Sequence, residues 1–181
     1  MANRINPESA PFAPEIDAAL KRIVPPNTPP LVLFTTLARN PRVFQRFMAG
    51  SLLDKGTITL REREIAIDRT TARCGSEYEW GAHVALLADR VGLTPAQIAA
   101  TRNGPADDPV WTPRERLVLA LVDALHDTHR IDDMLWQKLR TEFSDEQLIE
   151  LVVLTGLYHM VSFVTNALAL PLEPYSARFP T

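Results

Sequence analysis

The chain contains the stretch Arg61-Glu62-Arg63-Glu64-Ile65-Ala66-Ile67, and nine residues later Ser76-Glu77-Tyr78-Glu79-Trp80-Gly81-Ala82-His83, which together decide the fold. Thr59 before the first stretch has a glutamate three residues on, and Ser76 opens the second in the same way. This spelling is typical of a helix start, in which the hydroxyl and the carboxylate cap the first turn. The sequence therefore predicts one helix over residues 60–74 and a second from 76 to about 91, joined as a hairpin at Gly75.

The second helix places three chemically active side chains in one column. Ser76, Glu79 and His83 are spaced i, i+3 and i+7, so they share a face. A capping box followed by an ordinary Glu–His pair explains this spacing, and so does an active site. Spacing alone does not decide between these two explanations.

Length and composition indicate one globular domain. The chain has 181 residues, of which 46% are hydrophobic and 23% charged, with a formal net charge of -3. This charge gives no electrostatic case for a nucleic-acid or anionic-membrane partner. The single cysteine excludes an intrachain disulfide, and Met1-Ala2-Asn3-Arg4 leads into prolines without an apolar signal region, so we expect a cytoplasmic protein.

Helical spacing of apolar residues recurs along the chain, and no segment alternates with period two. We expect an all-α bundle of about eight helices. Residues 1–50 are predicted to be a proline-rich arm whose helices pack on the body, residues 51–172 the main helical domain, and residues 173–181 a tail. Residues 59–63 and 112–116 match at four of five positions, which suggests either two related helical units or a shared capping pattern.

Residues 151–170 contain no formally charged side chain and are long enough to cross a bilayer. Polar residues within the stretch and the absence of flanking basic clusters favour a buried central helix instead. A helix apolar on all sides also predicts self-association, since a small monomer cannot bury it together with its neighbours.

Glu64, the spacing of Ser76, Glu79 and His83, and the following Ala88 and Gly92 resemble the carboxymuconolactone decarboxylase / alkyl hydroperoxidase D-like family. In the hydroperoxidase branch, a glutamate is followed by eleven residues, Cys-x-x-Cys, three residues and a histidine. Here serine and glutamate replace both cysteines, so the chain is more similar to the branch that lacks the cysteine pair. The likeness is strongest over residues 60–102 and absent in the arm.

The resemblance implies that His83 is the general acid/base, Glu64 its relay partner, and Glu79 an orienting or second proton-carrying group. It also implies a cofactor-free lyase or isomerase acting on a small carboxylated lactone or enolisable acid, in a dimer, trimer or hexamer. Two alternatives stay open. One is a peroxidase that uses Cys74, and the other is a non-catalytic oligomer of the same fold.

Five more residues are candidates for lining a substrate pocket. They are Ser76, Cys74, Trp80, Arg73 and His159. Each also has an ordinary structural explanation: a helix cap for Ser76, a buried thiol for Cys74, packing for Trp80, a solvated helix end for Arg73 and a hydrogen-bonded core histidine for His159.

A metal site is the least favoured interpretation of the remaining histidines. His126 with Asp123, Asp127 and nearby His129 has ligand-type side chains at helical spacing, but histidines near a helix C-terminus also interact favourably with its dipole. We therefore expect no metal and no cofactor.

Overall fold

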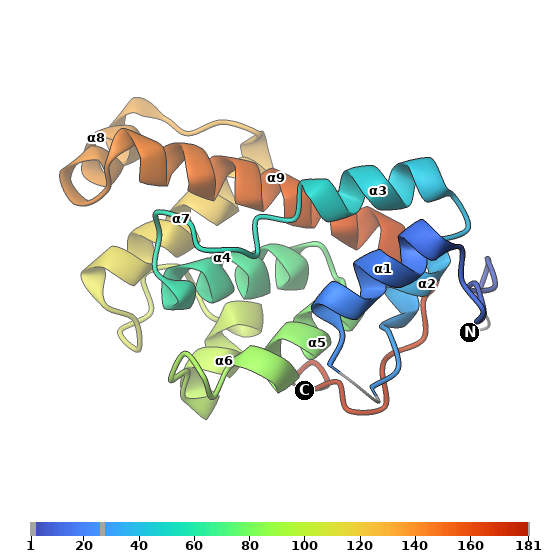
Figure 1. Cartoon of the computed structure of the whole chain (residues 1–181). Helices are drawn as coiled ribbons and strands as arrows, with labels where there is room; N and C mark the ends of the chain where they lie inside the picture. Colours follow the sequence, from blue (N-terminus) through green and yellow to red (C-terminus); the bar gives the residue numbers. More distant parts are fainter. Residues whose placement is uncertain (1–2, 26–27, 181) are drawn as a thin grey trace.

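The capped amphipathic segments form nine α-helices in the computed structural model, which describes residues 3–25 and 28–180 (Figure 1). The predicted all-α fold is confirmed, and these ranges contain no strand. Met1, Ala2, Pro26, Asn27 and Thr181, which the sequence assigns to the arm and the tail, lie outside the described residues. The helices are α1 (Pro14–Ile23), α2 (Val32–Leu37), α3 (Pro41–Ala49), α4 (Leu60–Arg73), α5 (Glu77–Leu87), α6 (Pro95–Asn103), α7 (Pro113–Thr128), α8 (Asp133–Glu142) and α9 (Asp145–Ala167).

Helix α4 lies at the centre of the body. Ile65, Ala66 and Ile67 are all fully buried, which is possible only for a helix covered on several sides. Helices α5, α6, α7 and α9 surround it. The prediction of a buried last helix is wrong in this respect, because α9 covers the core with one face and exposes Ile149, Val153 and Phe163 on the other.

Helix α9 remains the one described helix whose length and composition would suit a membrane span. A core helix of a soluble protein can have the same length and composition, so this finding is weak evidence for a membrane span.

The repeated five-residue motif joins α4 to α7 by two reciprocal ion pairs. Arg61 at the start of α4 binds Glu115 of α7 at 2.6 Å, and Arg114 of α7 binds Glu62 of α4 at 2.5 Å. The arginine of each copy thus contacts the glutamate of the other. This symmetric exchange favours two related helical units over a coincidence of capping pattern.

The α4–α5 hairpin depends on Gly75, whose φ is +65°. The Ser76 amide donates to the Thr71 carbonyl at 2.9 Å, which ends α4 and turns the chain back at once. Helix α5 ends at Leu87, earlier than predicted, and a turn leads to Gly92 at φ +68°.

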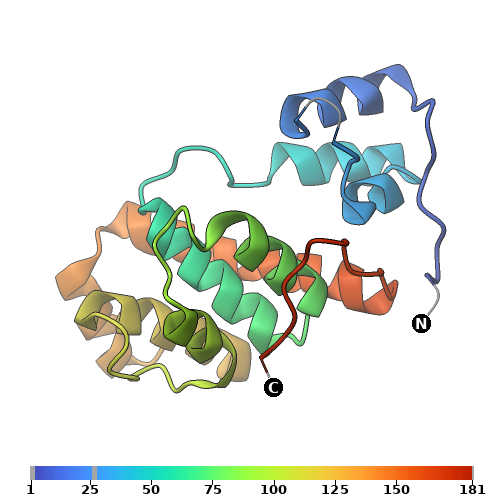
Figure 2. The same ribbon diagram turned by 90° about the horizontal axis from the view of Figure 1, so that it is seen from below.

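Helices α1–α3 form a group beside the body, joined to it by the extended segment 50–59 (Figure 2). The Leu33 amide donates to the Tyr78 hydroxyl at 3.0 Å, and the Val32 amide donates to Glu173 of the tail at 2.6 Å. Tyr78 also donates to Glu173. One tail carboxylate therefore holds the start of α2 against α5.

Candidate active site

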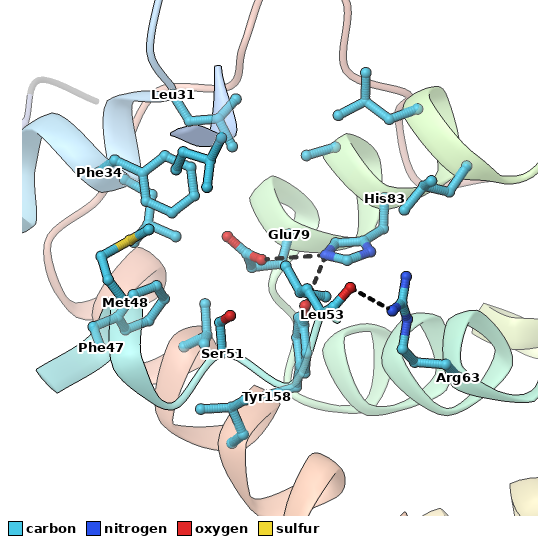
Figure 3. A pocket seen from close by; sticks show the side chains of 17 residues that line it. Leu31, Phe34, Phe47, Met48, Ser51, Leu53, Arg63, Glu79, His83 and Tyr158 are labelled. Carbon is cyan, nitrogen blue, oxygen red and sulfur yellow. Dashed lines mark hydrogen bonds and ion pairs between the residues drawn. The ribbon is translucent and has the colours of Figure 1, made fainter. Parts of the chain in front are cut away.

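A cavity of about 290 Å³ lies between the arm and the body (Figure 3). Most of its wall is apolar and comes from both parts, including Phe34 and Phe47 of the arm and Leu157 of α9. The polar lining residues are Ser51, Arg63, Glu79, His83 and Tyr158. An apolar cleft with a few converging polar groups is the usual form of a small-molecule site.

His83 is the centre of the polar group. Its Nδ1 lies 2.7 Å from Glu64 Oε2, and its Nε2 lies 3.1 Å from the Tyr158 hydroxyl and 3.9 Å from Glu79 Oε2. Glu64 is only 1% exposed and lies behind the imidazole, so it contacts His83 and not the cavity. The structure therefore brings together the three residues predicted as catalytic, and their role in catalysis stays a prediction.

Glu79 departs from the capping pattern that its position would suggest. Four other helices begin with a reciprocal box in which both side chains cap the backbone, at Thr59/Glu62, Thr94/Gln97, Thr112/Glu115 and Ser144/Gln147. At α5, Ser76 accepts from the Glu79 amide, but the carboxylate of Glu79 does not return to the Ser76 amide. It lines the cavity instead. Only the Ser76 half of the predicted capping box is formed, and the Glu79 carboxylate faces the cavity.

The environment separates the pKa values of the two carboxyl groups. Burial raises the pKa of Glu79 to about 7, with Glu173 adding to the rise against the opposing effect of His83. Burial acts on Glu64 in the same sense, but its hydrogen bond and charge interaction with His83, aided by Arg63, hold its pKa below the ordinary value. Glu64 is thus a permanent anion, while Glu79 exchanges its proton near neutral pH.

The histidine and the tyrosine are tuned by the same groups. Burial lowers the pKa of His83, yet the hydrogen bond and charge of Glu64 outweigh it and raise the pKa overall. Burial and the nearby carboxylates hold the pKa of Tyr158 well above its usual range, so its phenol stays neutral. Fully buried Asp68 also has a pKa raised well above normal by burial, and its Oδ1 has no hydrogen-bond partner in the described chain.

Three polar residues that line the cavity, Ser51, Arg63 and Tyr158, were not predicted from the sequence. Tyr158 was passed over for its neighbour His159, although its spacing from Leu151, Leu154 and Val161 would have placed it on the buried face of α9. Arg63 lies within the stretch 61–67, where the sequence alone gives it no role in the site. Its Nε donates to Glu64 Oε1 at 3.0 Å and its Nη1 to the Leu53 carbonyl at 2.8 Å, so the guanidinium is fixed at the cavity wall.

None of the five additional pocket candidates lines this cavity, so the structure does not bring them to the candidate site. Ser76 is fully buried as the cap of α5, and its hydroxyl lies 2.8 Å from that of Thr165. Trp80 is a packing residue whose Nε1 donates to the Thr101 hydroxyl at 2.9 Å.

The other three candidates lie near the far end of α4. Arg73 forms ion pairs with Asp127 and Asp123, since it points from the end of α4 toward α7. Cys74 and His159 approach each other beside His126. Asp123, Asp127 and His129 do not join that group: the aspartates bind arginines, and His129 Nδ1 contacts the Leu125 carbonyl at 3.2 Å.

The arrangement around the cavity is suited to proton transfer. When His83 is neutral, its Nδ1–H donates to Glu64 and its Nε2 accepts from Tyr158. When His83 is charged, its Nε2–H donates to the Tyr158 oxygen, and the Tyr158 hydroxyl proton is then free to be donated to a substrate in the cavity. An anionic partner on one nitrogen and an exchangeable group on the other are the features of a histidine acid/base.

Comparison with known proteins agrees with the fold. An uncharacterised peroxidase-related protein from Ralstonia eutropha, described as an alkylhydroperoxidase AhpD core, superposes with a TM-score of 0.84 at 21% identity, covering 95% of this chain and 93% of its own. A peroxidase-related protein from Silicibacter sp. gives a TM-score of 0.81 at 18% identity, with 95% and 92% covered. The debrominase Bmp8, solved as a variant with 2,3,4-tribromopyrrole, gives 0.80 at 17% identity, with 97% and 94% covered.

No curated protein matches the sequence. The model of the carboxymuconolactone decarboxylase family matches residues 39–124, a span that contains Glu64, Glu79 and His83. This match identifies residues 39–124 as similar to the carboxymuconolactone decarboxylase family, and the described chain shares the all-helical fold of the AhpD-like structures.

Proposed function

We propose that the protein is a cofactor-free lyase or isomerase that uses His83 as its general acid/base on a small enolisable carboxylic acid or carboxylated lactone. One observation carries the proposal. His83 is held by buried Glu64 at 2.7 Å through Nδ1 and directs Nε2 toward Tyr158 and Glu79 at the wall of the cavity.

Decarboxylation of an unsaturated γ-carboxylated lactone illustrates the chemistry. The bond to the carboxylate breaks, CO2 leaves, and the electron pair passes through the ring double bond to the lactone carbonyl oxygen. The resulting dienolate takes up a proton on carbon. His83 supplies this proton directly or through the Tyr158 hydroxyl, and Glu64 stabilises the imidazolium beforehand. Glu79, whose pKa is about 7, serves as a second proton carrier.

The cavity also suggests which substrates fit. Its apolar wall suits a small ring, and Arg63 provides a fixed cation. Pairing Arg63 with the departing carboxylate would stabilise the ground state, so the guanidinium is better suited to a carboxylate that stays on the substrate or to the developing oxyanion. A protein of the same fold, Bmp8, binds the small ring of tribromopyrrole, which is consistent with a ligand of this size.

A peroxidase that uses Cys74 is not favoured. The thiol lies outside the cavity lining, and burial raises its pKa, which is the opposite of what a reactive thiolate requires. A non-catalytic role is not favoured either, because a purely structural protein gains nothing from keeping Glu79 buried beside an open cavity instead of capping its helix.

The test compares two histidine variants by CO2 release from a γ-carboxylated unsaturated lactone. His83→Asn should lower kcat at least about 100-fold, the usual contribution of a positioned acid or base. His129→Asn is the matched control and should retain full activity. His129 is exposed at the end of α7 with φ +60°, a conformation that asparagine tolerates.

Cys74→Ser separates the lyase from the peroxidase. If Cys74→Ser leaves lactone turnover intact while His83→Asn abolishes it, the proposal stands. Hydroperoxide turnover that is lost in Cys74→Ser and kept in His83→Asn would refute it in favour of the thiol chemistry.

We further propose that the cytoplasmic protein self-associates through the apolar face of α9. Phe163 and Ile149 are each 65% exposed on this face, and Val153 is 52% exposed. A second copy of the same face would bury them symmetrically. Sedimentation of the wild type and of Phe163→Glu tests this, and a monomer at all concentrations for both proteins would rule it out.

A further inference from the structure

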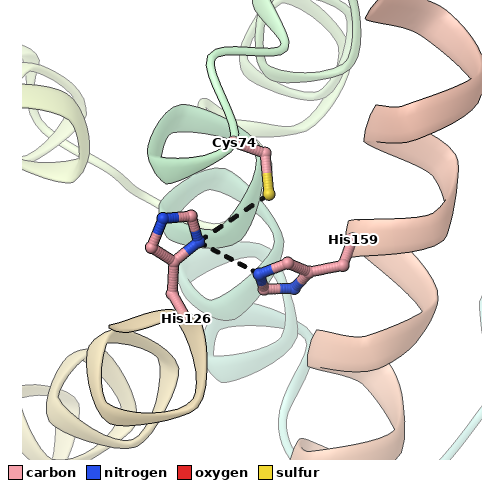
Figure 4. A group of neighbouring side chains, drawn as sticks. All are labelled: Cys74, His126 and His159. Carbon is pink, nitrogen blue, oxygen red and sulfur yellow. Dashed lines mark hydrogen bonds between the residues drawn. The ribbon is translucent and has the colours of Figure 1, made fainter. Parts of the chain in front are cut away.

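We propose that Cys74, His126 and His159 form a binding site for one divalent transition-metal ion of the zinc class. The site is separate from the cavity, since none of the three residues lines it. The three side chains come from the ends of α4 and α7 and the middle of α9, and they converge on one point (Figure 4).

The spacing of the ligand atoms fits tetrahedral coordination. His126 Nδ1 lies 3.0 Å from His159 Nε2 and 3.9 Å from Cys74 Sγ, and all three atoms lie within 4.8 Å of one another. Metal bonds of about 2.05 Å to nitrogen and 2.3 Å to sulfur place tetrahedral neighbours about 3.3 Å apart for two nitrogens and about 3.6 Å apart for nitrogen and sulfur. Shifts of a few tenths of an ångström would bring the two pairs that include His126 to these distances, and the pair of Cys74 Sγ and His159 Nε2 would close by at most about 1.2 Å.

The hydrogen bonds around the cluster leave the ligand atoms correctly oriented. His159 Nδ1 donates to the Thr155 carbonyl at 2.9 Å, which fixes the proton there and directs the Nε2 lone pair at His126 and Cys74. A backbone carbonyl in this position is the usual outer partner of a metal-bound histidine. Without an ion, His126 Nδ1 carries a proton and donates it to the lone pair of His159 Nε2. When an ion binds to His126 Nδ1, His126 carries its proton on its own Nε2 instead.

The backbone around the cluster is equally fixed. The Cys74 amide donates to the Thr70 carbonyl at 2.9 Å, and the Cys74 carbonyl accepts from the Asn166 side chain of α9 at 2.9 Å. The nearby cation Arg73 is paired with Asp123 and Asp127, and the two carboxylates act against its repulsion of a second cation. The site is thus held by packed helices before any ion arrives.

The donor set determines the ion. A thiolate and two imidazoles favour zinc, cobalt or copper over magnesium and calcium, which prefer oxygen ligands. Binding replaces the thiol proton, so one proton is released for each ion bound. Three protein ligands leave a fourth position, which the partial exposure of all three residues opens to water.

The test uses the full-length chain without an affinity tag, stripped with a chelator and titrated with Co(II). The wild type should bind one equivalent, with the intense visible absorption of a tetrahedral site and a sulfur-to-cobalt charge-transfer band, and Zn(II) should displace the ion. Cys74→Ser should lose the charge-transfer band, and His126→Asn and His159→Asn should each bind at least about tenfold more weakly.

Two controls locate the ion. His129→Asn removes a histidine of the same helix, and His83→Asn removes the histidine of the cavity; both should bind Co(II) as the wild type does. Circular dichroism confirms that each variant is folded. The proposal is wrong if the folded wild type binds no Co(II), if Cys74→Ser keeps the wild-type spectrum and affinity, or if His83→Asn is the variant that loses the ion.

Discussion

Because the pKa of Glu79 is raised, the free energy of unfolding depends on pH, and the substitution Glu79→Gln should remove this dependence. The ordinary value of 4.5 is raised to about 7 in the folded protein, chiefly by burial. Each pKa unit corresponds to about 1.36 kcal/mol, so ionised Glu79 costs about 3.4 kcal/mol relative to the unfolded chain. The folded state binds the Glu79 proton more tightly than the unfolded chain does. The contribution of this proton to the free energy of unfolding is therefore fully present below about pH 4.5 and is lost as the pH rises through about 7.

Glu79→Gln keeps the shape of the side chain and removes this titration. We expect the free energy of unfolding of the variant, relative to the wild type, to increase by about 2 to 3 kcal/mol between pH 5 and pH 8. Urea unfolding at several pH values measures the difference, with Glu142→Gln, at an exposed position at the end of α8, as the control substitution of the same kind. A difference between variant and wild type that is the same at pH 5 and pH 8 would refute the raised pKa.

Three further predictions concern stability. Gly81→Ala places a Cβ only 2.3 Å from the Ala177 carbonyl oxygen, so the tail should detach and be cut faster in limited proteolysis, at a cost of about 1 to 3 kcal/mol. Gly75→Ala meets no neighbour but must keep φ at +65°, so the midpoint of urea unfolding should fall by about 1 kcal/mol without a change in its slope. Glu115→Gln keeps its helix cap and loses the charge facing Arg61, and a double-mutant cycle with Arg61→Ala should give a coupling of about 1 kcal/mol.

The helices and the central pair of the site could be predicted because both depend on local spacing. Capping motifs fix where helices begin, and Glu64 and His83 lie on two helices joined by one tight turn. The α9 partner of His83 could not be assigned from the sequence. Choosing Tyr158 over His159 depends on how the helix is rotated about its axis, and a helix that is apolar on almost every side does not reveal this. A shift of one residue turns a side chain by about 100°, and here it exchanges the cavity for the cluster around Cys74.

The cavity itself was beyond prediction for a different reason. One of its walls belongs to the arm, and the position of the arm depends on contacts between residues far apart in the sequence, such as Val32 with Glu173. Likewise, the spacing of Glu79 in the sequence fits both a helix cap and an active-site carboxylate. Only the structure shows that its carboxylate leaves the cap and faces the cavity, where Glu173 also raises its pKa.

The shared wall of the cavity links ligand binding to the docking of the arm. Phe34 and Phe47 reach the cavity from a group of helices that is joined to the body by the extended segment 50–59. A ligand that contacts these rings as well as His83 adds its binding energy to the arm–body contact. By thermodynamic reciprocity, the arm then strengthens ligand binding by the same factor as the ligand strengthens docking. Substitutions of Phe34 or Phe47, which carry no proton-exchanging group, will therefore alter substrate affinity and the protection of the arm from hydrogen exchange together.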